Sequence, residues 1–183
     1  MARLNSIVRL AVKDPYDSLV PIFRGERTPP RVQQHGTGVY FKLNGDVYLL
    51  TAAHVIDGSE PGQLLVPGPD GLVPIVGSMY ASFIGDEDQE RDNADFALFR
   101  LGAQCKKALN HHFSALPQTR TELLTTSLEL GCCSISGYPV SKGTNRSGRL
   151  SSEIYSFRGV AAKGTTYEKL GLDPSANIIV HYD

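Results

Sequence analysis

The sequence has few cysteines and no arrangement of residues typical of a metal site. Of its three cysteines, Cys132 and Cys133 are adjacent and cannot easily form a disulfide with each other, and Cys105 has no obvious partner. A reducing compartment is the simplest explanation, so we expect a cytoplasmic protein. There is no Cys-x-x-Cys motif, and His111-His112 lacks a second ligand pair at metal-binding spacing. We therefore expect neither a metal nor a cofactor.

Long apolar runs and an excess of charge of one sign are also missing. No run approaches the roughly 20 apolar residues that span a bilayer, and the N-terminus lacks a positively charged stretch followed by an apolar core. With 18 basic and 19 acidic side chains the net charge is -1. No overall electrostatic field therefore favours nucleic acid or an anionic membrane as a partner. We expect a soluble, unexported protein that binds neither.

The chain does contain short hydrophobic runs separated by clusters of Gly and Pro. This pattern favours β-strands. Two runs, Val39 to Leu43 and Val47 to Leu50, flank Asn44-Gly45, a dipeptide that tolerates positive φ, and predict a hairpin. The apolar positions of Leu4 to Val12 fit neither a strand nor a helix cleanly, so that segment stays open. Further strands are expected at 63–66, 72–84, 96–101, 128–136, 153–160 and 177–182, turns at 142–145 and 172–175, and a helical turn at 106–111.

Two segments place residue types suited to acid–base chemistry at the ends of predicted strands. His54 follows the hairpin within Thr51-Ala52-Ala53-His54-Val55, a run of small residues from which an imidazole can project into a cleft. Asp95 immediately precedes the run 96–101, where a sheet end can hold a carboxylate rigidly. An imidazole that accepts a proton and a carboxylate that fixes its tautomer are what nucleophilic hydrolysis requires. We predict that His54 and Asp95 are catalytic, with Asp92 as the alternative carboxylate.

These segments resemble those of the trypsin-like (chymotrypsin-fold) serine peptidases of bacterial type. In that family a Gly-x-Gly strand, here Gly36-Thr37-Gly38, leads through a hairpin to a Thr-Ala-Ala-His signature, here Thr51 to His54. The stretch Asn93 to Leu101 resembles the family's Asp segment, and Ser136-Gly137-Tyr138-Pro139 resembles a strand end of its second barrel. The resemblance covers roughly residues 20 to 183, and the His signature is its specific part.

The resemblance implies an all-β, chymotrypsin-like double β-barrel. The second barrel is expected to be incomplete in this chain, because only about three strands are signalled there where the family has six. We expect an N-terminal segment at residues 1–25, a first barrel carrying His54 and Asp95 at 26–110, a connection between barrels at 111–126, and a partial second barrel at 127–183.

The sequence does not identify the Ser of a His–Asp–Ser triad, because it contains no Gly-x-Ser-Gly segment. In the family order the Ser would follow Asp95 by about 90 residues, at about position 188. Ser147 stands in a Ser-Gly step but lacks the preceding Gly, and Cys132 and Cys133 lie in an apparent strand, where a buried structural thiol is expected. The resemblance thus implies that a Ser, or a Cys as in some relatives, lies beyond Asp183 together with the oxyanion hole, and that these 183 residues are inactive alone.

The leading hypothesis is a trypsin-like serine endopeptidase of a prokaryotic cell. It would hydrolyse protein or peptide substrates by acyl transfer through a His–Asp–Ser triad. Its own C-terminal fragment is a further candidate partner, if the gene product is nicked after Asp183. The alternative is an inactive peptidase-fold module that binds a protein through its cleft. The presence of both His54 and Asp95 argues against the alternative, because binding alone requires neither.

Overall fold

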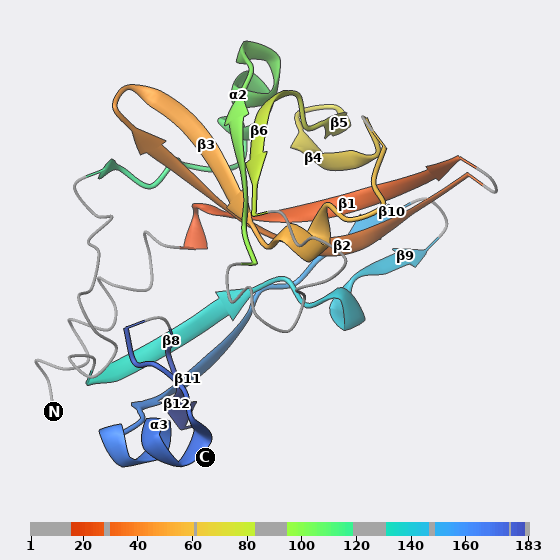
Figure 1. The fold of residues 1–183 in the computed structure, drawn as a ribbon. Helices are drawn as coiled ribbons and strands as arrows, with labels where there is room; N and C mark the ends of the chain where they lie inside the picture. The colour runs from red at the N-terminus through yellow and green to blue at the C-terminus, as the bar shows by residue number, and fades with distance from the viewer. Residues whose placement is uncertain are drawn as a thin grey trace, which may run out of the picture.

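The computed structural model describes residues 16–27, 30–60, 62–82, 95–118, 131–146, 149–175 and 177–181. In this part the chain is mostly β, as predicted: a seven-stranded sheet, a three-stranded sheet and a separate two-stranded ribbon (Figure 1). Two short α-helices accompany the sheets in the described residues, α2 (Ala103–Leu109) and α3 (Gly164–Leu170). None of the described helices is long and apolar enough to cross a membrane.

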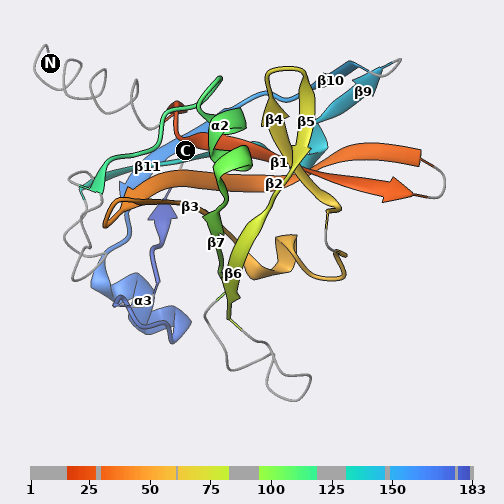
Figure 2. The same ribbon diagram turned by 90° about the horizontal axis from the view of Figure 1, so that it is seen from above.

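The seven-stranded sheet is antiparallel throughout and curls into a half-barrel (Figures 1 and 2). The strand order is β5-β4-β1-β2-β3-β7-β6. Pairing begins at Leu19, ahead of residue 26, where the first barrel was predicted to start. The strands are β1 (Leu19–Arg27), β2 (Pro30–Leu43), β3 (Asp46–Thr51), β4 (Leu64–Gly68), β5 (Gly71–Pro74), β6 (Gly77–Ala81) and β7 (Ala97–Leu101).

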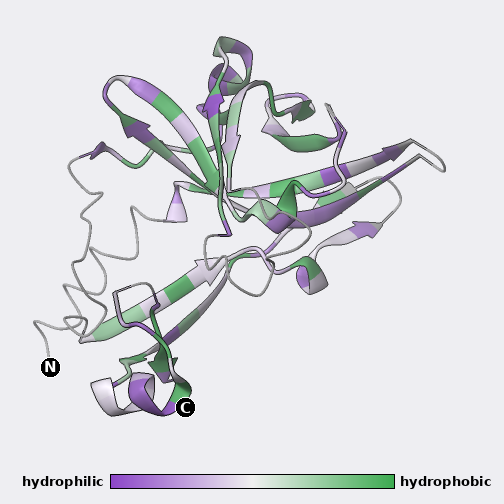
Figure 3. Cartoon of the chain, in the orientation of Figure 1, coloured by the Kyte–Doolittle hydropathy of each residue, from purple (hydrophilic) through white to green (hydrophobic). Residues whose placement is uncertain are grey.

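The concave face of this sheet encloses the hydrophobic core. In β7 the side chains of Ala97, Phe99 and Leu101 are buried and those between them are not, as expected for a strand with one face inside. In β3 the buried Val47 and Leu49 likewise alternate with less buried residues, and Figure 3 shows hydrophobic and hydrophilic bands along this strand. Helix α2 contributes Cys105 and Leu109 to the core. At about 25 cal/mol per Å², each large buried side chain contributes about 1.5–3 kcal/mol. The largest fully buried side chains of this core are those of Tyr40, Ile22, Leu49, Leu109, Val20 and Val66.

The predicted hairpin is confirmed. Asn44 and Gly45 join β2 to β3 with φ angles of 50° and 86°, and Leu43 pairs with Asp46. The strands expected at 63–66 and 96–101 correspond to β4 and β7, and the helical turn expected at 106–111 corresponds to α2. The run 72–84, predicted as strand throughout, is two strands. The two strands pair with different partners, β5 with β4 and β6 with β7, so the chain leaves one end of the strand order and rejoins the sheet at the other. Residues 83 and 84 of the predicted run lie outside the described part of the chain.

The second half contains the three-stranded sheet in the order β12-β11-β8, formed by β8 (Cys132–Gly137), β11 (Tyr155–Ala161) and β12 (Val180–His181). These match the three expected strands, although β12 is shorter. The segment 142–145, predicted as a turn, instead leads from the 3-10 helix η4 (Val140–Lys142) into the hairpin of β9 (Thr144–Arg146) and β10 (Arg149–Ser151). This hairpin lies beside the β1–β2 hairpin (Figures 1 and 2), and Asn145 Nδ2 donates to Val32 O. The segment 4–12 and residues 128–130 fall outside the described part of the chain.

Candidate active site

His54 and Asp95 are brought together by the pairing of β3 with β7. His54 lies in the 3-10 helix η1 (Ala53–Val55), which follows β3, and Asp95 lies just before β7. Thr51, the last residue of β3, pairs with Ala97, so the C-terminal end of β3 and the start of β7 lie side by side at the same end of these two strands. Ala53 and Val55 on either side of His54 are buried, which anchors η1 while the His54 ring remains outside. The positions that the sequence analysis selected are therefore neighbours in space.

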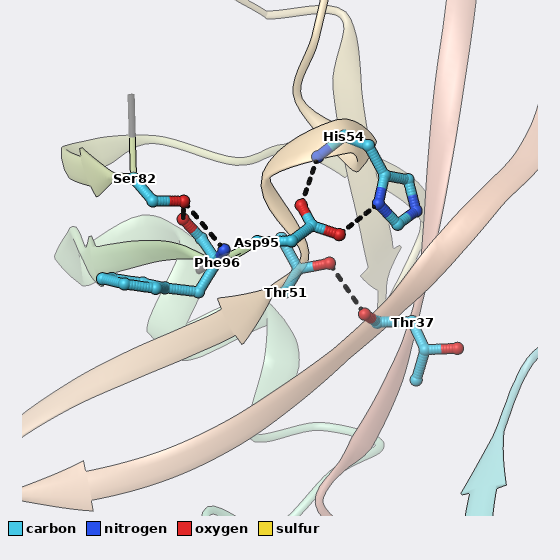
Figure 4. Close-up of polar contacts among 6 residues, drawn as sticks. All are labelled: Thr37, Thr51, His54, Ser82, Asp95 and Phe96. Atoms are coloured by element: carbon cyan, nitrogen blue, oxygen red, sulfur yellow. Dashed lines mark hydrogen bonds and ion pairs between the residues drawn. The ribbon is translucent and has the colours of Figure 1, made fainter. Parts of the chain in front are cut away.

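Both oxygens of the Asp95 carboxylate accept hydrogen bonds from His54 (Figure 4). Asp95 Oδ2 lies 2.6 Å from His54 Nδ1, and the His54 backbone N–H donates to Asp95 Oδ1 at 3.0 Å. The side chains are 69% and 44% exposed, respectively. Two contacts from one residue fix the carboxylate relative to both the backbone and the ring of His54.

The same contacts favour the ionised form of Asp95 and set the tautomer of a neutral His54 ring. Partial burial alone would raise the pKa of Asp95, but the hydrogen bonds from the His54 backbone and ring and the charge of His54 lower that pKa below its ordinary value. Asp95 is therefore an acceptor at neutral pH, and the proton of a neutral His54 ring lies on Nδ1. Nε2 then carries the lone pair, which is the form in which an imidazole accepts a proton.

A serine that the sequence analysis did not single out fixes the backbone next to Asp95. Ser82 Oγ accepts from the Phe96 N–H at 3.0 Å and donates to the Phe96 carbonyl at 3.2 Å (Figure 4). The Ser82 backbone N–H also donates to Phe96 O at 2.9 Å. Phe96, the residue after Asp95, therefore has both its backbone N–H and its carbonyl hydrogen-bonded to Ser82. No sequence motif marks Ser82, because its role depends on pairing with a segment 14 residues away.

The Gly-x-Gly motif has a steric explanation in this structure. A Cβ at Gly36 would come within 2.8 Å of Val55 Cγ2, and a Cβ at Gly38 within 2.7 Å of Leu49 Cδ1. Strand β2 therefore passes close to η1 and to β3 only because both positions lack a side chain. Between them Thr37 accepts, on its carbonyl oxygen, a 2.8 Å hydrogen bond from Thr51 Oγ1. The motif predicted from the sequence thus supports the element that carries His54.

His35 is a second histidine near this pair that the sequence analysis missed. It occupies a register shift, since Ile22 pairs with Gly36 and Phe23 with Gln34, which leaves His35 without an opposite residue. Burial lowers the pKa of His35, and the charges of Arg24 and His54 lower it further, against the opposing effect of the Val55 backbone. Its buried Nε2 atom has no hydrogen-bond partner in the structure. A neutral imidazole is therefore favoured at this position.

The structure gives His54 no nucleophile within the described residues: every polar contact of its side chain there is with Asp95. Ser147 and the alternative carboxylate Asp92 lie outside the described part of the chain. Cys132 is exposed and Cys133 half-buried, so the expectation of buried thiols was wrong for β8, whose sheet presents its side chains to solvent. Cys105 is buried. Among the described residues, no group of three or more His, Cys, Asp or Glu side chains could hold a metal ion.

Comparisons with known proteins give no family for this chain. No family model matches it, and no curated protein matches it. One solved structure that does match comes from work on how aromatic interactions drive the coupled folding and binding of the intrinsically disordered Sesbania mosaic virus VPg protein. It is 22% identical with a TM-score of 0.42, and the alignment covers 79% of this chain and 63% of that one. This chain therefore spans less than two thirds of that chain's length, and a similarity this weak assigns neither fold nor function.

Proposed function

We propose that this chain is the part of a trypsin-like serine endopeptidase that carries the general base and its carboxylate, with the nucleophile supplied by residues beyond Asp183. The observation that supports this most is the double contact between His54 and Asp95, 2.6 Å at the ring and 3.0 Å at the backbone. A carboxylate that holds Nδ1–H and leaves Nε2 as the acceptor is the arrangement that a Ser–His–Asp mechanism requires.

In this mechanism His54 Nε2 takes the proton of the nucleophile as it attacks the substrate's peptide carbonyl. Asp95 keeps the ring in the Nδ1–H tautomer and stabilises the imidazolium that forms. His54 then gives the proton to the leaving amine, which leaves an acyl-enzyme that water hydrolyses by the same steps. The exposure of the His54 side chain, 69%, leaves room for a substrate and a nucleophile beside the ring.

The second sheet supports a further part of the proposal, that of an incomplete second barrel. Ile135 and Phe157 are directly opposite in the β8–β11 pair and therefore on one face, and they are 58% and 57% exposed. In a chymotrypsin-like double barrel, the corresponding face is covered by further strands. We infer that residues following Asp183 complete this barrel and position the nucleophile and the oxyanion hole.

Labelling with a fluorophosphonate, which reacts with an activated serine, tests the proposal. The full-length gene product should be labelled, whereas its His54→Ala variant and the 183-residue chain alone should not be. Intact mass under denaturing conditions, compared with 19.9 kDa for these residues, would show whether the product is one longer chain or two fragments. If the full-length product reacts with neither this probe nor a cysteine-directed probe, the peptidase proposal is wrong.

The second candidate is a binding module with a peptidase fold and no activity. The exposed apolar face around Ile135 and Phe157 favours it, because contiguous exposed apolar side chains often mark interaction surfaces. The same labelling experiment separates the two candidates. A gene product that proves to be a single 19.9 kDa species and remains unlabelled would make the binding module the better account.

A further inference from the structure

Strand β2 of the first sheet carries hydrogen bonds that reach the second half of the chain. Gln34 Nε2 donates to Pro139 O at 2.5 Å, and the Tyr138 N–H donates to Thr37 Oγ1 at 2.7 Å. Farther along β2, Asn145 Nδ2 donates to Val32 O at 3.1 Å. The segment 138–145 is therefore attached to the same strand that passes under η1 and His54.

Among the β2 residues that form these hydrogen bonds, Thr37 is bonded to both halves of the chain. Its carbonyl oxygen accepts from Thr51 Oγ1 at 2.8 Å, three residues before His54, and its hydroxyl accepts from Tyr138 N at 2.7 Å. Figure 4 shows the carbonyl turned toward Thr51 and the side chain directed away from the His54–Asp95 pair. One residue thus links the end of β3 to the backbone that follows β8.

The packing around this link is tight. A Cβ at Gly137 would lie 3.0 Å from Thr37 Oγ1, and a Cβ at Gly143 would lie 2.5 Å from Gln34 Cβ. Gln34 is only 4% exposed. Two glycines of the second half therefore let its backbone approach β2, so a shift of the segment 137–143 would break the Thr37 contact.

We propose that Thr37 is a positioning residue that sets where the second half sits relative to His54: its hydroxyl docks the segment after β8, and its carbonyl holds the end of β3. The proposal rests on the proposed function, in which the second half continues into the segment with the nucleophile. Thr37 forms no hydrogen bond with His54 or Asp95 in the structure, so its proposed effect on the reaction is indirect. Thr37 acts by fixing the distance between the two halves. A reaction between His54 on the first half and a nucleophile on the second is sensitive to that distance.

The first test measures amide hydrogen exchange in the 183-residue chain. Thr37→Val removes the hydroxyl at nearly constant volume, Thr37→Ser keeps it, and Asn145→Ala removes a different bond between the halves. The Tyr138 amide should exchange about tenfold or more faster in Thr37→Val and at its wild-type rate in Thr37→Ser and Asn145→Ala. The Ile22 amide in β1 should be unchanged in all three. Thr37→Ala replaces Thr37→Val if the latter does not fold.

The second test measures steady-state peptide hydrolysis by the full-length gene product. Thr37→Val should lower kcat by about 10- to 100-fold with KM nearly unchanged, because the nucleophile is misplaced while substrate contacts remain. Thr37→Ser should restore kcat, and Asn145→Ala should stay within about twofold of wild type. A purely structural role would instead lower the amount of folded enzyme without this split between kcat and KM.

The outcomes separate this proposal from the proposed function. Unchanged Tyr138 exchange in Thr37→Val overturns it, and so does faster exchange with kcat at the wild-type level. If wild-type full-length protein hydrolyses no peptide and reacts with neither a fluorophosphonate nor a cysteine-directed probe, the peptidase proposal is wrong. The exchange result then decides alone whether Thr37 docks the second half onto the first.

Discussion

At the scale of single residues, the proposed chemistry depends on the proton of the His54 ring staying on Nδ1. Both Asp95 oxygens now face N–H groups of His54, at 2.6 Å and 3.0 Å. In an Asp95→Asn variant one of these acceptors becomes an NH₂ donor, which favours the wrong tautomer of the ring. The rate of fluorophosphonate labelling of the full-length gene product should fall by about 10³- to 10⁴-fold.

Asp70→Asn is the matched control, because Asp70 is an exposed carboxylate in the turn between β4 and β5. It should leave the labelling rate unchanged. An Asp95→Asn variant that is labelled within about tenfold of the wild-type rate would contradict the assigned role.

His35 predicts a pH dependence of stability. Its pKa in the folded state is lowered, chiefly by burial, so the unfolded chain binds the proton more readily. The stabilisation from the neutral form is complete above the unfolded pKa of about 6.5 and is lost as pH falls below it. Urea unfolding at pH 7.5 and 5.5 should show a loss of stability for the wild type that is smaller for His35→Gln. An equal pH dependence for both proteins would show that His35 does not titrate as described.

Residues differ in how far the sequence identifies them. His54 and Asp95 could be selected because each stands in a local pattern at a strand end. Thr37, Ser82 and His35 could not, because their roles arise from partners distant in sequence: Thr37 Oγ1 meets Tyr138 N across 101 positions. His35 lies at a register shift between β1 and β2 that hydrophobic periodicity does not show.

At the scale of elements, the 3-10 helix η1 packs closely against strand β2 at Gly36. A Cβ at Gly36 would come within 2.8 Å of Val55 Cγ2, so Gly36→Ala must push η1 outward. We expect a loss of about 1–3 kcal/mol in the free energy of unfolding, measured in urea, because overpacking a well-filled site displaces backbone. The double variant Gly36→Ala/Val55→Ala should lose less than the sum of the two single variants, because the clash is removed.

Gly25→Ala is the control for this experiment, since a Cβ there meets Leu65 Cδ1 at 3.4 Å, an ordinary contact. It lies in β1 of the same sheet and should have little effect. Additive losses in the Gly36/Val55 pair would mean that η1 does not rest on Gly36.

Elements defined by local turn chemistry were the ones that the sequence predicted well. The β2–β3 hairpin follows from Asn44-Gly45, whose φ angles are 50° and 86°. The break between β5 and β6 accompanies a change of partner, since β5 pairs with β4 and β6 with β7, and a continuous apolar run conceals such pairing. Helix α3 was missed because it is short and buries only Tyr167, which leaves little helical periodicity.

At the scale of the whole molecule, the two halves differ in how much apolar surface they bury. The half-barrel surrounds a core that includes Tyr40, Leu49 and Phe99, whereas β8 and β11 leave Ile135 and Phe157 more than half exposed. The same β2 strand supports His54 on one side and receives the second half on the other. In the proposed peptidase, β2 is thus the strand through which the completed second half would be positioned relative to His54.

The proposed completion of the second half predicts that one substitution has different effects in the 183-residue chain and in the full-length gene product. Phe157→Ser in the 183-residue chain should change the free energy of unfolding by less than about 0.5 kcal/mol, because the side chain is 57% exposed. In the full-length gene product, where we propose that following strands cover it, the same change should cost about 3 kcal/mol. Met79→Ser is the control, because Met79 is 51% exposed on the first sheet and should behave alike in both lengths. Equal effects of Phe157→Ser in both would mean that residues beyond Asp183 do not cover this face, and the proposal of a completed second barrel would be wrong.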